Sequence, residues 1–235
     1  MDKKVSVIIP ARNEEKFLER AIKSIRNQSY KNTEIIVVVN GSTDKTIEIA
    51  EKNSDKVLNF KDALGYNIPR NEGAKIARGE VLLFLDADTQ LSNNVILQVV
   101  DNITPTTVGT CLCRPDTKSI KARLFVAFKN FIHRTKIFKS VSSGGVIFCN
   151  KKFFFQIGGF GTEKNIGEFC GFIKKAEKNG GEYKYLTNCY AIVSMRRYEE
   201  RGYLIIFWIW IKYRIGLFFG GGEKTAKKYI LNEKK

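Results

Sequence analysis

The sequence predicts an α/β protein with a Rossmann-like, mostly parallel, doubly wound sheet and helices on both faces. The first hundred residues alternate short apolar runs with segments of helical periodicity. Within the expected strand 34–39, the residues after Glu34 are continuously apolar, as expected for a strand buried on both faces of a parallel sheet. Two aspartates directly follow another apolar run, at 81–85. A strand–helix alternation of this kind requires right-handed crossovers, and it places ligands at the carboxyl ends of the strands.

The first half contains four expected strands and three expected helices. The strands are Val5–Ile9, which Pro10 ends, Glu34–Val39, Lys56–Phe60 and Glu80–Leu85. The helices between them are Glu14–Asn27, Thr46–Lys52 and Asn67–Arg78. Ser42, Thr43 and Asp44 have the side chains of a helix N-cap, so they are expected to start the second helix.

The second half is less regular. We expect strands at 108–113, 145–149, 183–186 and 190–194, and helices at 119–139, 151–157 and 168–179. The stretch 158-GGFG-161 predicts a turn. Since there is no internal repeat or low-complexity linker, residues 1–200 are expected to form one domain, followed by a tail at 201–235.

Composition limits the class of partner. The 235 residues carry a net charge of +16, which favours nucleic acid, an anionic membrane or phosphorylated ligands. The five cysteines are scattered without metal-binding spacing, which predicts reduced core thiols in a cytosolic protein. The N-terminal apolar run is too short for a signal peptide. A single histidine disfavours most histidine-based catalysis.

The tail contains the apolar stretch 203-YLIIFWIWIKYRIGLFF-219. Its unbroken apolar core, 204–211, is far shorter than the roughly 20 residues that a spanning helix needs. We therefore expect an apolar helix or hairpin lying in the membrane interface, with the basic segment 223–235 favouring anionic lipid. The expected interfacial anchors are Tyr203, Trp208, Trp210 and Tyr213. A core helix or a self-association surface is the alternative.

The stretch 81-VLLFLDADTQL-91 predicts a cation site. Unpaired carboxylates are costly to bury, yet Asp86 and Asp88 end an apolar strand. Two carboxylates one residue apart can converge on Mg²⁺ or Mn²⁺, which prefer oxygen ligands and complete their shell with water and substrate phosphates. Alone the pattern is weak, because Asp-x-Asp also occurs in ordinary loops.

Three further stretches give the pattern a context. They are 8-IIPARNEE-15, 34-EIIVVVNGSTDKT-46 and 70-RNEGAKIARGE-80. In this order, ahead of the Asp-x-Asp strand, they resemble the family 2 glycosyltransferases over residues 3–200. The resemblance implies a GT-A fold, with a nucleotide-binding half at 1–90 and an acceptor-binding half at 91–200. It also implies a hexosyltransferase of the EC 2.4 class that uses Mn²⁺ or Mg²⁺.

The resemblance assigns the donor side. Asn40 takes the place of an acidic residue that usually reads the base, and Val39 replaces the Asp often found before it. An amide still offers a donor and an acceptor, so binding is expected with an altered base preference. The residues implied to bind the nucleotide sugar are Pro10, Ala11, Arg12, Glu14, Asn40, Arg70, Asp86, Ala87 and Asp88, of which Asp86 and Asp88 also hold the metal.

The resemblance also implies a catalytic base at the start of the 168–179 helix. The family usually has a Glu-Asp pair there, but this chain has Glu168 and Phe169, and a further acidic position is Gly171. Three readings stay open: Glu168 serves as the base, Glu163 replaces it, or catalysis is impaired. Glu168 could also merely stabilise its helix N-terminus.

The acceptor side is implied by two stretches. Ser143, Gly144 and Gly145 would form the acceptor-side wall of the site. A ligand can approach the backbone closely at glycine, which has no side chain. Arg196 and Arg197, within 194-SMRRY-198, would hold the diphosphate or the acceptor. The alternative for the arginines is a solvated basic pair.

Together these features predict an inverting, metal-dependent transferase at the cytoplasmic face of the membrane. Its donor would be a nucleoside diphosphate sugar, and its acceptor a polyprenyl-linked, other lipid-linked or cell-envelope glycan. The alternative is a relative that binds the nucleotide sugar without turnover, which Phe169 motivates. A nucleic-acid binder is disfavoured, since no such motif is present.

Overall fold

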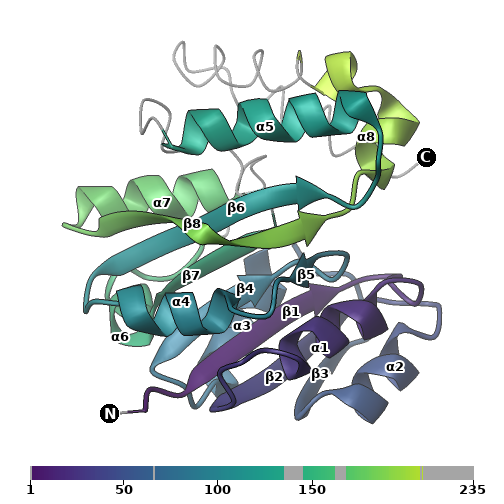
Figure 1. Ribbon diagram of the computed structural model, residues 1–235. Helices are drawn as coiled ribbons and strands as arrows, with labels where there is room; N and C mark the ends of the chain where they lie inside the picture. The colour runs from purple at the N-terminus through teal and green to yellow at the C-terminus, as the bar shows by residue number, and fades with distance from the viewer. Residues whose placement is uncertain (1, 66, 135–144, 162–167, 207, 209–235) are drawn as a thin grey trace.

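The computed structural model describes residues 2–65, 67–134, 145–161, 168–206 and 208 (Figure 1). Its centre is an eight-stranded sheet with the order β3-β2-β1-β4-β7-β6-β8-β5. The strands are β1 Val5–Ala11, β2 Thr33–Asn40, β3 Lys56–Phe60, β4 Val81–Leu85, β5 Gln90–Leu91, β6 Thr107–Pro115, β7 Val146–Asn150 and β8 Glu182–Val193. The helices are α1 Leu18–Arg26, α2 Thr46–Asn53, α3 Asn67–Ile76, α4 Val95–Asn102, α5 Ile120–Arg134, α6 Lys151–Gln156, α7 Glu168–Lys178 and α8 Arg196–Arg201.

The first four strands form the parallel part that the sequence predicts. β1 lies between β2 and β4, and β2 pairs with β3, all in parallel. β1 continues through Pro10 to Ala11, beyond the predicted end at Ile9. The pairing of β1 with β4 stops at Ile8, so the missing amide of Pro10 interrupts no bond between these two strands.

The second part of the sheet is mixed. β7 runs antiparallel between β4 and β6, β6 is parallel to β8, and the short β5 closes the edge antiparallel to β8. The fold is therefore an α/β fold with a mixed, mostly parallel sheet. β7 joins the two parts directly, since each of its five residues pairs with β4.

Several elements differ from the expected ones. β8 is one strand rather than the two expected at 183–186 and 190–194, because a register shift opposite Cys111 and Leu112 absorbs residues 187–189. α4 and β5 were not predicted, although Val95, Ile96 and Val99 give α4 a buried face. The expected helix at 119–139 is seen as α5 up to Arg134, and residues 135–139 lie outside the described ranges.

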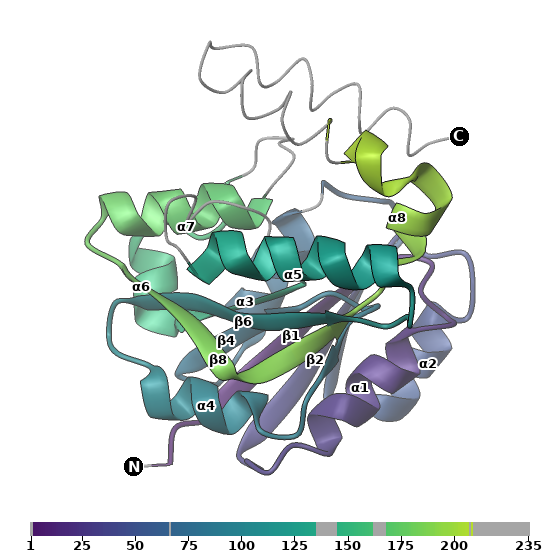
Figure 2. The same ribbon diagram turned by 45° about the horizontal axis from the view of Figure 1, so that its top comes forward.

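Helices cover both faces of the sheet (Figure 2). One apolar cluster joins the sheet to α1, α2 and α4, and a second joins the opposite face to α3, α6 and α7. α5 lies over β6 and forms a third, smaller cluster with the end of β8. This arrangement leaves the carboxyl ends of β1, β2 and β4 for a site. Within the described residues, no helix is long and apolar enough to span a membrane.

Candidate active site

The loops that follow β1 and β2 are locked together. Asn13, which has a left-handed φ of 53°, accepts a hydrogen bond at Oδ1 from the backbone N–H of Thr43. The backbone N–H of Glu14 donates to Thr46 Oγ1, and that of Glu15 donates to Asp44 Oδ2. The residues predicted to cap the second helix, α2, therefore do so only in part. Asp44 accepts from the Thr46 N–H, but Lys45 occupies the N-cap position and the main partners of this segment lie in the β1–α1 loop.

Asn40 ends β2 and holds a neighbouring loop. Its Nδ2 donates to the Leu64 carbonyl at 3.1 Å, and its Oδ1 accepts from the Leu64 N–H at 2.8 Å. The side chain is buried, and one donor and one acceptor position are already used. The recognition of the nucleotide base by Asn40 stays a prediction. The hydrogen bonds of Asn40 to Leu64 hold the loop that precedes α3.

The Asp-Ala-Asp turn lies at the end of β4. Ala87 is buried, while the side chain of Asp86 is 37% exposed and that of Asp88 is 19% exposed. Gly145 packs against this turn: its carbonyl accepts from the Asp86 N–H at 2.8 Å. Gly145 has a φ of +78°, and a Cβ there would lie 2.4 Å from Thr89 Oγ1. A glycine is therefore required at this point.

Arg196 connects the end of β8 to both carboxyl-end loops. Its Nη2 lies 2.5 Å from Glu14 Oε1 and 3.5 Å from Asp88 Oδ2. Its guanidinium carbon stands 4.4 Å from the centroid of the Phe17 ring. The alternative interpretation of the two arginines as a solvated basic pair is therefore wrong for Arg196. The side chain of Arg197 is exposed. Arg196 joins the Asp-x-Asp turn to the first motif.

Two carboxyl groups of this cluster have raised pKa values. Burial raises the pKa of Glu14 more than its hydrogen bond from Arg196 lowers it, and Glu14 Oε2 is buried with no partner among the described residues. Burial, and then the charge of Asp86, raise the pKa of Asp88. Both effects mark carboxylates that would gain from a nearby cation.

Arg70, from α3, approaches the same turn from the other side. Its Nη2 donates to Asp86 Oδ1 at 2.9 Å. Its guanidinium carbon lies 4.9 Å from the centroid of the Phe169 ring, and the Phe169 side chain is buried. The residue that replaces the family's usual second carboxylate therefore packs on the arginine that pairs with Asp86.

The Gly-Gly-Phe turn is held by α3. Asn71 Nδ2 donates to the Phe160 carbonyl, Asn71 Oδ1 accepts from the Phe160 N–H, and Asn67 Nδ2 donates to the Gly161 carbonyl. Lys175 of α7 donates to the carbonyls of Gly158 and Gly159. Sequence reasoning missed Asn67 and Asn71, although Asn71 directly follows Arg70 in the third motif.

The remaining predicted residues lie at the end of β1, at the start of α7 or outside the described residues. Pro10 and Ala11 end β1, and Arg12 is exposed just beyond it. Glu168 is the first residue of α7, next to Phe169, so its backbone lies on the Arg70 side of the site. Ser143, Gly144 and Glu163 lie outside the described residues.

Asp86 and Asp88 supply two carboxylates for a cation. Among the described residues, no group of three or more His, Cys, Asp or Glu side chains is placed to hold a metal. Mg²⁺ and Mn²⁺ are commonly held by one or two carboxylates together with substrate phosphates. The donor set therefore fits an ion that binds with a diphosphate.

Comparison with known proteins identifies the family. Residues 6–181 match the profile of Glycosyl transferase family 2. The chain belongs to this family. Its curated relatives include a GalNAc(5)-diNAcBac-PP-undecaprenol beta-1,3-glucosyltransferase of Campylobacter jejuni, 39% identical over 99 residues, which is 40% of this chain and 32% of the relative. Another is the poly(ribitol-phosphate) beta-N-acetylglucosaminyltransferase TarS of Staphylococcus aureus, 37% identical over 101 residues, 40% of this chain and 18% of the relative. The chain thus matches less than half the length of these family 2 relatives.

Solved structures support the fold of the family 2 chain. S. aureus TarS 1-349 in complex with UDP-GlcNAc aligns with a TM-score of 0.63 at 20% identity, covering 82% of this chain and 59% of that one. The mannosyltransferase PcManGT of Pyrobaculum calidifontis, in complex with GDP-Man and Mn²⁺, aligns with a TM-score of 0.65 at 19% identity, covering 80% and 56%. At this identity the likeness establishes the GT-A-like fold alone.

Proposed function

We propose that this family 2 protein transfers a sugar from a nucleoside diphosphate sugar to a hydroxyl group of a lipid-linked or cell-envelope glycan. Inversion at the anomeric carbon follows from a single displacement. The observation that carries the proposal is the convergence of Asp86, Asp88, Arg70 and Arg196 at the carboxyl end of β4. The C. jejuni and S. aureus relatives, which act on an undecaprenol-linked glycan and on poly(ribitol phosphate) by name, support the acceptor class.

In this mechanism each residue has a distinct task. The β1–α1 loop, with Arg12 and Glu14, binds the nucleoside. Arg70 and Arg196 orient the diphosphate, since guanidinium groups suit phosphate geometry. A Mn²⁺ or Mg²⁺ ion held by Asp86 and Asp88 would neutralise the departing diphosphate.

Glu168 is the proposed base on the acceptor side. It takes the proton of the attacking hydroxyl, from the start of α7. In this proposal Ser143, Gly144 and Gly145 line the acceptor side, and Arg197 binds the acceptor. The protein works peripherally, at the cytoplasmic face of an anionic membrane where lipid-linked acceptors are available.

The test is nucleoside diphosphate release across a donor panel with Mn²⁺, with and without a membrane extract as acceptor. We expect metal-dependent release that Asp88→Ala and Glu168→Gln each lower by at least a hundredfold. Asp101→Asn, an exposed carboxylate of α4, is the matched control and should retain full activity. Donor binding without release from any donor or extract would instead support the second candidate, a nucleotide-sugar-binding protein, which the Phe169–Arg70 contact favours.

A further inference from the structure

α5 is apolar on two opposite sides. Its inner side packs on the sheet through Ala122 and Val126. Its outer side carries Ile120, Leu124, Phe128 and Phe131, which are 72%, 68%, 47% and 63% exposed. Their spacing of four, four and three residues places them on one stripe along the helix. We call these four residues the outer stripe.

The outer stripe continues onto the segment that follows α8. Residues 203–206 and 208 are helical, and Leu204, Ile205 and Trp208 are 75%, 59% and 57% exposed. The two elements are fixed to each other, because the Phe125 ring of α5 contacts the Tyr203 ring at a centroid distance of 5.6 Å. Figures 1 and 2 both place α8 beside the start of α5.

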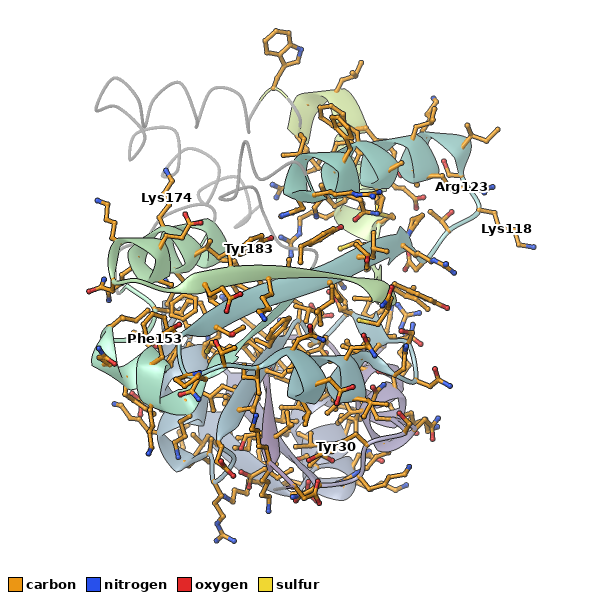
Figure 3. All side chains as sticks on the ribbon, turned by 60° about the vertical axis from the view of Figure 1, so that its left-hand side comes forward. Tyr30, Lys118, Arg123, Phe153, Lys174 and Tyr183 are labelled. Atoms are coloured by element: carbon orange, nitrogen blue, oxygen red, sulfur yellow. The ribbon has the colours of Figure 1, made fainter. Side chains whose placement is uncertain are left out.

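The exposed charged side chains of α5 and of residues 117–119 just before it are all basic. Residues 117–134 contain no Asp or Glu, and Lys118, Lys121, Arg123 and Arg134 are exposed. Lys118 and Arg123 extend away from the body of the molecule at the start of α5 (Figure 3). The exposed acidic side chains nearby are Asp116, which precedes α5, and Glu199 and Glu200 of α8. An apolar stripe with basic residues along its sides is complementary to a layer of anionic groups that covers an apolar interior.

We propose that α5, together with residues 204–206 and Trp208, forms a docking surface for an anionic lipid bilayer, with α5 lying in the interface plane. A second copy of the chain fits less well, since a symmetric contact would bring the basic residues of the two copies together. α5 is about 22 Å long at 1.5 Å per residue, enough to lay the whole stripe on the headgroup boundary. The exposed Trp208 suits the same boundary.

The docking surface is connected to the candidate active site. Tyr198 of α8 contacts Phe125 of α5 at a centroid distance of 5.0 Å, and α8 begins with Arg196, which pairs with Asp88. This inference extends the proposed function, because docking through α5 would hold the donor site at a fixed place relative to a lipid-linked acceptor.

The experiment is co-sedimentation of the full chain with vesicles of phosphatidylcholine alone and with vesicles that also contain phosphatidylglycerol, whose anionic headgroups attract basic segments. We expect binding to the anionic vesicles that Leu124→Glu/Phe128→Glu weakens at least tenfold. The matched control is Leu97→Glu/Phe155→Glu, which changes one exposed Leu and one exposed Phe on α4 and α6. It should bind as the wild type does. Circular dichroism checks folding.

A second variant, which removes charge from α5, keeps the proposal testable if Leu124→Glu/Phe128→Glu does not fold. Lys121→Gln/Arg123→Gln should weaken binding to anionic vesicles by about tenfold or more, and salt should have the same effect. Equal binding by all variants would overturn the proposal. So would a dimer in sedimentation velocity that Leu124→Glu/Phe128→Glu dissociates, which would assign the stripe to a second copy. Vesicle binding needs no donor, so a protein that docks without transferring sugar would leave this inference standing and remove only the proposed function.

Discussion

At the residue scale, Phe169 stands where the resemblance implies a carboxylate, and its ring contacts the site in another way. It stacks on Arg70, whose guanidinium is already paired with Asp86. Removing the ring should therefore loosen Arg70 without removing any charge from the site.

Phe169→Leu tests that role. The variant keeps an apolar side chain but loses the cation–π contact, which is worth about 1 kcal/mol. We expect donor affinity to fall about fivefold, measured by isothermal titration calorimetry with the best donor of the panel. Phe172→Leu, in the same aromatic cluster, is the control and should lose stability without losing donor affinity. Equal affinities for Phe169→Leu and wild type would show that Arg70 is positioned by Asp86 alone.

Gly145 gives a second test at this scale. Gly145→Ala strains the left-handed φ of +78° and drives a Cβ into Thr89 Oγ1. We expect a loss of about 2–4 kcal/mol in unfolding free energy by urea titration, together with weaker donor binding. Gly180→Ala is matched, since Gly180 has a φ of +77° but nothing within 4 Å of a Cβ. It should cost only about 1 kcal/mol, and a similar cost at both positions would contradict the clash.

At the element scale, Glu34 fastens β2 to its neighbours. It accepts hydrogen bonds from Ser6 of β1 and from the backbone N–H groups of Arg78 and Gly79, and its Oε2 lies 3.2 Å from Lys56 Nζ of β3. Burial raises its pKa, but these partners outweigh burial and leave the pKa below its usual value of 4.5. This one carboxylate stabilises the arrangement of three strands.

The pH dependence follows from that lowered pKa. A depressed folded pKa adds stability that is fully present above the unfolded value near 4.5 and is lost as the pH falls through the folded value. Glu34→Gln should cost about 2 kcal/mol at pH 7. The difference in unfolding free energy between variant and wild type should shrink below about pH 4. A difference that stays constant from pH 7 to pH 3 would contradict the assignment.

The elements also show what sequence reasoning can reach. The parallel strands of the first half were predicted because each is a local apolar run between turn signals. The place of β7 was not, because pairing with both β4 and β6 depends on contacts more than 35 residues apart. The order of the second half is thus invisible to local patterns.

The same limit applies to the site. Arg70, Asp86 and Asp88 were predicted to bind the same nucleotide sugar, because the resemblance assigns all three to the donor side, and the structure pairs Arg70 of α3 with Asp86 at the end of β4. The pairing of Arg196 with Glu14 joins residues 182 positions apart, and only the fold brings them together. The hydrogen bonds of Asn71 to the backbone of Phe160, in the Gly-Gly-Phe turn, depend on tertiary contact in the same way.

At the scale of the whole molecule, the predicted halves 1–90 and 91–200 share one core. The first apolar cluster contains Val7, Val37 and Leu83 together with Val146 and Phe148 of β7. All five residues of β4 are fully buried, and β7 covers the edge of β4 that a cut at residue 90 would expose. The two halves are therefore expected to share their stability.

This shared core predicts a single cooperative unfolding transition. Urea titrations followed by far-UV and near-UV circular dichroism should coincide, because secondary structure and aromatic packing are lost together. A fragment of residues 1–90 should not fold alone, since it would leave the apolar edge of β4 unpaired. Hydrogen exchange of its amides should then approach random-coil rates. A soluble 1–90 fragment with protected β1 and β4 amides would show instead that the nucleotide-binding half is an independent folding unit, and that β7 merely docks on it.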